Sequence, residues 1–155
     1  MSGLGRAPAP VALVDDNVHS ARLLLRTLAG RGCRARWLGN GERAARSLEA
    51  AFKGAEAPPE LVVVDLKSRT GASAEFIARF AKQAHANGTI MVAMAPSLAA
   101  EHREAALRAG AAAVFQRHAN RADYHREICA MMEFWGRKKC PEEVSPSSPW
   151  GTEAR

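Results

Sequence analysis

The sequence contains few cysteines and no long apolar run. Its three cysteines, Cys33, Cys129 and Cys140, are an odd number without CxxC spacing, which argues against a disulfide framework and favours a reducing cytoplasm. The longest apolar runs, around residues 61–64 and 109–115, are far shorter than the roughly 20 residues that a membrane span needs. The first ten residues lack the apolar stretch of a signal peptide. These absences exclude a membrane span and predict a cytoplasmic location.

Motifs of common enzymes and nucleic-acid-binding proteins are also missing. There is no GxSxG elbow and no P-loop, and the Gly3-Leu4-Gly5 segment precedes the first expected strand, so it does not form a nucleotide-binding turn. The five histidines have no metal-ligand spacing with cysteine or with one another. No helix-turn-helix or zinc-finger pattern follows. We therefore expect no enzymatic activity, and nucleic acid is not the favoured partner.

The composition is that of one globular domain. The chain has 155 residues, of which 47% are hydrophobic and 25% charged. Lys and Arg (22) exceed Asp and Glu (16), giving a net charge of +6. The segment 137–155 carries four basic and three acidic residues, so the excess belongs mainly to the body of the chain. It is interpreted as a solvated, partner-facing protein surface rather than a nucleic-acid footprint.

Short apolar segments alternate with segments of helical periodicity along the chain. Strands are expected at Val11–Val14, Cys33–Leu38, Leu61–Asp65, Ile90–Met94 and Ala111–Phe115. Helices are expected from Val18 to Gly30, after Asn40 as N-cap, around Phe76–Ala84, at Leu98–Arg108 and at Arg121–Gly136. Five repeats of strand and helix predict an α/β fold, a doubly wound five-stranded parallel sheet with helices on both faces, of the flavodoxin-like (βα)5 type.

The two ends of the chain differ in composition from its body. Residues 1–10 are expected to form a flexible leader, 11–137 the folded domain and 138–155, rich in Pro, Ser and Glu, a disordered tail. Trp150 in this tail is either an exposed aromatic residue or a docking residue. Cys33 and Cys129 are expected to be buried, and Cys140 exposed.

Three carboxylates follow buried strands. In such a sheet the strands end at one edge, so Asp15, Asp16 and Asp65 are expected to lie close together. Carboxylates this close need a counter-charge, usually a divalent cation or a lysine, and oxygen ligands suit Mg²⁺. The alternative is that each aspartate only caps the helix that follows it.

With these residues the sequence resembles the receiver domain of bacterial response regulators, the CheY-like type. The resemblance covers residues 11–137 and is carried by Val11-Ala12-Leu13-Val14-Asp15-Asp16-Asn17, Leu61-Val62-Val63-Val64-Asp65-Leu66 and Ala109-Gly110-Ala111. It implies that Asp65 accepts a phosphoryl group from a histidine kinase. It also implies a Mg²⁺ site formed by Asp65, by Asp16 directly, by Asp15 mainly through water, and by the backbone carbonyl of Lys67.

Two positions of the family's site carry other residues here. Where the family has a switch Thr or Ser at the end of the fourth strand, this chain has Ala95, which offers no hydroxyl to the phosphoryl group. Ser97, beyond Pro96, is only a partial replacement. At the family's lysine position, after the fifth strand, stands Arg117, which keeps the charge but presents a fork instead of a point charge.

Further departures affect the same region. The family's Lys-Pro bond becomes Arg117-His118, which we expect to be trans because a cis bond without proline costs about 2.5–4 kcal/mol. The switch aromatic of the fifth strand is replaced by Val114. Lys67 is either a solvated loop lysine or a cation that neutralises Asp65 or Asp16 and competes with Mg²⁺.

The leading hypothesis is therefore an atypical stand-alone receiver in two-component signalling, whose phospho-acceptor Asp65 works with an impaired switch and which acts through protein–protein contact. The alternative is a phosphorylation-independent pseudo-receiver, a constitutive interaction module. An enzyme on a flavodoxin-like scaffold is a third hypothesis with no motif to support it.

The resemblance also implies partners. These are a histidine kinase or phosphotransfer protein, or another signalling protein, and a homodimer through the face of the fourth and fifth helices. Four apolar residues of the last helix could serve such a dimer, although their helical spacing also fits the core: Met131, Met132, Phe134 and Trp135.

Overall fold

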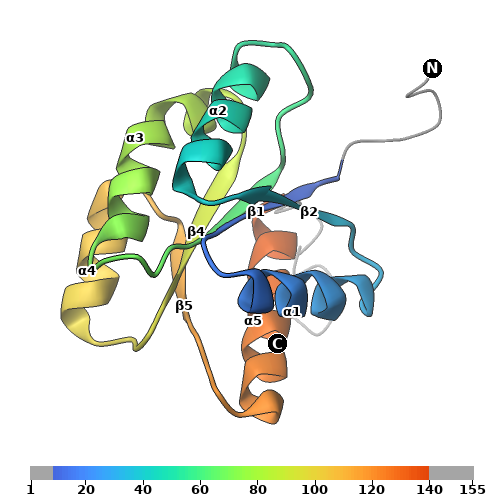
Figure 1. Cartoon of the computed structure of the whole chain (residues 1–155), viewed down its shortest axis with the longest axis vertical. Coiled ribbons are helices and arrows are strands. Elements are labelled where there is room, and N and C mark those ends of the chain that lie inside the picture. Colours follow the sequence, from blue (N-terminus) through green and yellow to red (C-terminus); the bar gives the residue numbers. More distant parts are fainter. Residues whose placement is uncertain (1–8, 140–155) are drawn as a thin grey trace, which may run out of the picture.

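The computed structural model describes residues 9–139. Strands and helices alternate along this part of the chain (Figure 1). The strands are β1 (Val11–Asp15), β2 (Ala35–Gly39), β3 (Leu61–Asp65), β4 (Ile90–Ala95) and β5 (Ala113–Gln116). The helices are α1 (Val18–Ala29), α2 (Gly41–Phe52), α3 (Ala72–Ala86), α4 (Ala100–Ala109) and α5 (Arg121–Lys139).

The strands form one parallel sheet in the order β2-β1-β3-β4-β5. The order reverses between β1 and β3, the place in a doubly wound sheet where ligand sites form beyond the carboxyl ends of the strands. The register pairs Asp15 with Asp65 across these two strands. The predicted flavodoxin-like architecture is thus confirmed, and the topology brings the two aspartates together.

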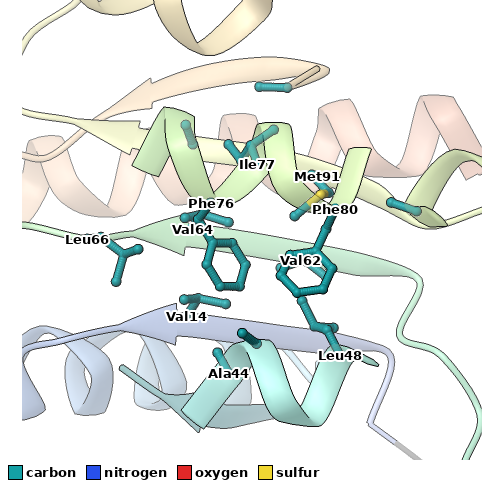
Figure 2. Close-up of a cluster of buried hydrophobic side chains, with 14 of the residues drawn as sticks. Val14, Ala44, Leu48, Val62, Val64, Leu66, Phe76, Ile77, Phe80 and Met91 are labelled. Atoms are coloured by element: carbon teal, nitrogen blue, oxygen red, sulfur yellow. The ribbon is translucent and has the colours of Figure 1, made fainter. Parts of the chain in front are cut away.

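Helices cover both faces of the sheet. On one face, α2, α3 and α4 pack over β1, β3 and β4, and Figure 2 shows Phe76, Ile77 and Phe80 of α3 above Val62 and Val64. On the other face, α1 and α5 enclose Leu13, Val63 and Val92 with a second buried cluster. Because β1 and β3 are covered on both faces, every residue in them is buried, which explains why each strand is apolar up to its final aspartate.

Local sequence signals account for several element boundaries. The Asn17 side chain accepts a hydrogen bond from the Ser20 amide at the start of α1, and the predicted N-cap Asn40 accepts from the Arg43 amide at 3.0 Å. Gly110 ends α4 with φ of 122°, and a Cβ placed there would lie 2.7 Å from Cβ of Ala81 in α3. The Ala109-Gly110-Ala111 sequence therefore needs glycine for both conformation and space.

Some predicted boundaries differ from the observed ones. β2 begins two residues later than predicted, at Ala35, and β5 covers Ala113–Gln116 rather than Ala111–Phe115. α5 continues through Lys139, so residues 138 and 139 are helical instead of belonging to a tail. Both edge strands lie where fewer neighbours constrain them, which makes their ends hard to read from an apolar pattern.

The cysteines are less buried than predicted, and most of both termini lies outside the described residues. Cys33 and Cys129 were predicted to be buried, but both are only partly buried. Most of the predicted leader and tail lies outside the described residues, together with Cys140 and Trp150. No helix of the described part, residues 9–139, is long and apolar enough to cross a membrane.

Candidate functional site

The candidate site is built around two buried carboxylates. Asp15 ends β1 and Asp65 ends β3, and only 1% and 6% of their surfaces are exposed. Carboxylates buried to this degree need charged or hydrogen-bonding partners to remain ionised. The loops that follow β1, β3 and β5 supply such partners.

Asp15 is held by several donors. Its Oδ1 accepts hydrogen bonds from the Asn17 amide at 2.8 Å and from Nζ of Lys67 at 2.7 Å, and its Oδ2 accepts from Oγ of Ser20 at 2.7 Å. The indole Nε1 of Trp37 in β2 donates to the Asp15 carbonyl at 2.9 Å. The residue is thereby fixed in backbone and side chain, so it does not act merely as a helix cap.

The Lys67 side chain enters the acidic site. Its Nζ lies 2.7 Å from Oδ1 of Asp15 and 3.2 Å from Oδ1 of Asp65, and it also donates to the Asp65 carbonyl at 3.1 Å. Only 27% of the side chain is exposed. The interpretation of Lys67 as a solvated loop lysine is therefore wrong, and its interpretation as a cation beside Asp65 is the one that the structure supports.

Arg117 supplies a second cation. Its Nε donates to Oδ1 of Asp65 at 2.6 Å, and its backbone amide donates to the Ala95 carbonyl at 2.8 Å. The side chain thus reaches from the end of β5, past β4, to the end of β3. Together, Lys67 and Arg117 balance the formal charges of Asp15 and Asp65.

The Asp16 side chain faces the backbone amides of the loop after β3. Its two carboxylate oxygens accept from the Lys67 amide at 3.1 and 3.0 Å, and Oδ2 also accepts from the Ser68 amide at 2.9 Å. Within residues 9–139, no group of three or more His, Cys, Asp or Glu side chains is placed to hold a metal ion. The prediction that Asp16 joins Asp15 and Asp65 around Mg²⁺ does not hold in this arrangement, because Asp16 holds the loop and Lys67 occupies the space beside the other two. These residues, as placed, do not fit a divalent cation.

The electrostatics of the site follow from burial and from these charges. Burial raises the pKa of Asp65, while Lys67 and then Arg117 act to lower it. Tyr124 of α5 is buried nearby, and burial followed by the negative charges of Asp65 and Asp15 raises its pKa well above the ordinary tyrosine value.

The two positions that the sequence resemblance assigns to the switch carry aliphatic side chains. Ala95 is buried at the end of β4, and Val114 packs against the cluster on the α3 side of the sheet. Ser97 does not replace the missing hydroxyl, since its Oγ lies 3.2 Å from Nδ1 of His102 and accepts from the Ala99 amide. As predicted, the Arg117–His118 bond is trans, because no cis peptide occurs among the described residues.

Several residues that were not predicted to belong to the site form hydrogen bonds that hold its backbone and side chains in place. Ser73 Oγ accepts from the Leu66 amide at 2.9 Å and fixes the backbone just after Asp65. Glu127 accepts from the Gln116 amide at 2.8 Å and lies 3.1 Å from Nε2 of His118. His118 is thereby tied to α5, while His19 is exposed. Trp37 and Tyr124 had only apolar periodicity as a signal, which indicates core and not contact with a site.

The sequence matches no protein-family model and no curated protein. Solved structures do match. The Mn(2+)-bound form of response regulator Rcp1 is 18% identical with a TM-score of 0.66, over 83% of this chain and 94% of that one. The phosphorylated cyanobacterial phytochrome response regulator RcpA is 20% identical with a TM-score of 0.67, over the same shares of the two chains.

A third match is a chain of the Saccharomyces cerevisiae co-crystal structure of the phosphotransfer protein Ypd1 with the receiver domain of the response regulator Ssk1. It is 18% identical with a TM-score of 0.63, over 88% of this chain and 94% of that one. At these identities the likeness establishes the fold, which is that of receiver domains. The fold implied by the sequence resemblance is thus confirmed.

Proposed function

We propose that this chain is an atypical receiver of two-component signal transduction that acts through protein–protein contact. In this proposal Asp65 is the phospho-acceptor and the switch that normally follows phosphorylation is impaired. The observation that carries the proposal is the placement of Asp65. It ends the third strand of a receiver fold, paired in register with Asp15 and contacted by the cation of Arg117 at the end of β5.

The chemistry of phosphoryl transfer explains why these residues matter. The phosphoryl group carries negative charge on its outer oxygens, so a nearby fixed cation stabilises both transfer and product. Arg117 can bind such a group through two parallel hydrogen bonds, which lysine cannot do. Asp65 provides the carboxylate that would attack.

The impaired switch is supported by Ala95 and Val114. Ala95 has no hydroxyl that could bond a phosphoryl oxygen, and the Ser97 hydroxyl, two residues further along, is paired with His102. Val114 has no ring that could change its position. Phosphorylation would therefore bring little displacement of α4, and the signal would have to be read at the strand ends themselves.

A second candidate function is a phosphorylation-independent pseudo-receiver. The observation that favours it is the ion-pair set of Lys67 and Arg117, which neutralises Asp65 and Asp15 without any added group. In this case the fixed surface alone binds the partner. Both candidates are binding functions, and neither requires the chain to be an enzyme.

The partners follow from the fold and from the chemistry of the surface. The Ypd1–Ssk1 complex supports a histidine kinase or phosphotransfer protein as the partner. A cytoplasmic location is part of the proposal. The face of α4 and α5 is proposed for self-association, but two of the four apolar α5 residues that could serve it, Met131 and Trp135, are buried in the core. Leu107 of α4 is 40% exposed and suits such a contact better.

One experiment separates the two candidates. Beryllofluoride, a phosphoryl mimic, is added to the full chain while amide resonances are followed by NMR, with Asp65→Asn as the matched control. Saturable shifts around Asp65 that are absent in Asp65→Asn support the phospho-acceptor. No response, together with a normal cellular phenotype for Asp65→Asn, overturns it in favour of the pseudo-receiver.

A further inference from the structure

The position between Asp15 and Asp65 is the one from which a cation would contact both carboxylates. We propose that the ammonium group of Lys67 is the resident cation of this site and takes the place of a divalent metal ion. The inference goes beyond the proposed function, since it holds whether or not Asp65 accepts a phosphoryl group. It predicts a receiver site that is complete without Mg²⁺.

The geometry gives the lysine partners on both strands. A lysine ammonium has three N–H donors and no acceptor. Its Nζ donates hydrogen bonds to Asp15 Oδ1 at 2.7 Å and to the Asp65 carbonyl at 3.1 Å, and it forms an ion pair with Asp65 Oδ1 at 3.2 Å. The ammonium group therefore contacts both carboxylates, one from β1 and one from β3.

The charges also balance. The buried carboxylates of Asp15 and Asp65 face the cations of Lys67 and Arg117. A divalent ion entering beside them would meet two positive groups at short range in a buried place, where like charges repel strongly. The metal would therefore have to displace Lys67 before it could bind.

Asp16 presents a second obstacle to a metal ion. Both of its oxygens accept backbone hydrogen bonds from Lys67 and Ser68. As placed, Asp16 is turned toward the backbone of the loop that carries Lys67, and the space beside Asp15 and Asp65 is taken by the lysine.

The inward direction of Lys67 is particular to this residue. Arg69, two residues further along the same loop, is exposed and pairs with Glu75 of α3 instead of with the site. A basic side chain in this loop therefore has a solvent-facing alternative. Arg69 also provides a matched control, because its removal changes the net charge of the loop by the same amount as removal of Lys67.

The test uses Mn²⁺ as the probe, added to the full-length chain up to millimolar concentration, with paramagnetic broadening of amide resonances as the readout. For the unmodified chain we expect no saturable broadening centred on Asp15 and Asp65. For Lys67→Gln we expect saturable broadening there, with an affinity at least about tenfold higher, equivalent to about 1.4 kcal/mol. Arg69→Gln should behave like the unmodified chain.

Two further variants make the result specific. Adding Asp65→Asn to Lys67→Gln should abolish the gained binding, and Lys67→Arg, which keeps a cation, should not gain it. Saturable binding by the unmodified chain at Asp15 and Asp65 would overturn the proposal, and so would a folded Lys67→Gln chain that gains none. If Lys67→Gln does not fold, the titration of the unmodified chain and of Lys67→Arg decides. Neither readout depends on phosphorylation, so the proposed function can fail while this inference stands, or the reverse.

Discussion

At the ends of β1 and β3, two buried carboxylates are each contacted by charged groups within hydrogen-bonding distance, whereas α4 buries a single residue, Ala106. The acidic site is held by directional polar contacts from three loops. In the α4–β5 region, Gly110 lies close to α3, and the small side chains of Ala106 and Ala111 belong to the buried cluster. The first region is thus held by polar pairing, and the second by contacts of small apolar residues.

This difference predicts that the largest loss of stability comes from breaking the acidic site. Asp15→Ala removes the acceptor of three hydrogen bonds and leaves Lys67 facing Asp65 alone. We expect the free energy of unfolding to fall by about 3–5 kcal/mol, as for other broken buried ion pairs. Urea unfolding followed by circular dichroism measures it.

Ser20→Ala is the matched control for this change, because it removes only the hydroxyl donor to Asp15 and keeps the ion pair. We expect a loss of about 1 kcal/mol. Equal effects of the two variants would show that the ion pair with Lys67 contributes no more to stability than an ordinary hydrogen bond. The acidic site would then not be the more strongly held of the two regions.

The next largest effect is expected at the single close contact of the α4–β5 region. Gly110→Ala places a Cβ 2.7 Å from that of Ala81 and forces a left-handed residue at φ 122°. Strain and overpacking together should lower the free energy of unfolding by about 3 kcal/mol. Gly88→Ala, at φ 73° with no atom within 4 Å, isolates the strain, for which we expect about 1 kcal/mol.

If Gly88→Ala and Gly110→Ala destabilise the protein equally, the packing of Gly110 on α3 does not hold the region. The same melts can be repeated for Leu107→Ala. Because Leu107 is exposed, we expect a change within about 0.5 kcal/mol. A larger loss for Leu107→Ala would mean that the Leu107 side chain also holds α4 in place, in addition to the contact of Gly110 with α3.

A smaller effect is expected where the two regions meet. Arg117 belongs to the end of β5 and its Nε donates to Asp65 at 2.6 Å, but its side chain is partly in solvent. Arg117→Ala should therefore lower the free energy of unfolding by about 1–2 kcal/mol. Arg117→Lys keeps the charge and should lose less, and thermal unfolding of the two variants side by side measures the difference. A larger loss for lysine than for alanine would contradict the assigned pairing.

The sequence was informative where a pattern reflects burial. The uninterrupted apolar residues of β1 and β3, each followed by aspartate, led to the sheet, its order of elements and the neighbouring positions of Asp15 and Asp65. Asn40 was predicted as an N-cap because its short polar side chain precedes a helical pattern. Ala95 and Arg117 were located differently, through the resemblance to receiver domains and their spacing from Asp65.

The remaining features depend on where a side chain turns in three dimensions. Nothing in the residues 67–71 distinguishes Lys67, which enters the site, from Arg69, which pairs with Glu75 on the surface. The direction is set by Asp16, which holds the loop amides from the other strand end. Trp37 likewise lies in an alternating apolar pattern, which gives no sign that its indole donates to the Asp15 carbonyl of the neighbouring strand.

The last prediction concerns how far the acidic site acts on the core around it. Tyr124 is the only tyrosine of the chain, and its pKa is raised first by burial and then by the charges of Asp65 and Asp15. The folded protein therefore keeps Tyr124 neutral. The stability that this provides is present below the ordinary tyrosine pKa and is lost as the pH rises through the raised value.

Ultraviolet absorbance of the tyrosinate ion, followed as the pH is raised, should thus show Tyr124 titrating later than free tyrosine. In Asp65→Asn the transition should move to lower pH, yet remain above the ordinary value, because burial is the larger cause of the shift. An unmoved transition would mean that Lys67 and Arg117 already screen the Asp65 charge from α5. The positive and negative charges of the acidic site would then cancel at the distance of α5, and the site would not change the pKa of core residues such as Tyr124.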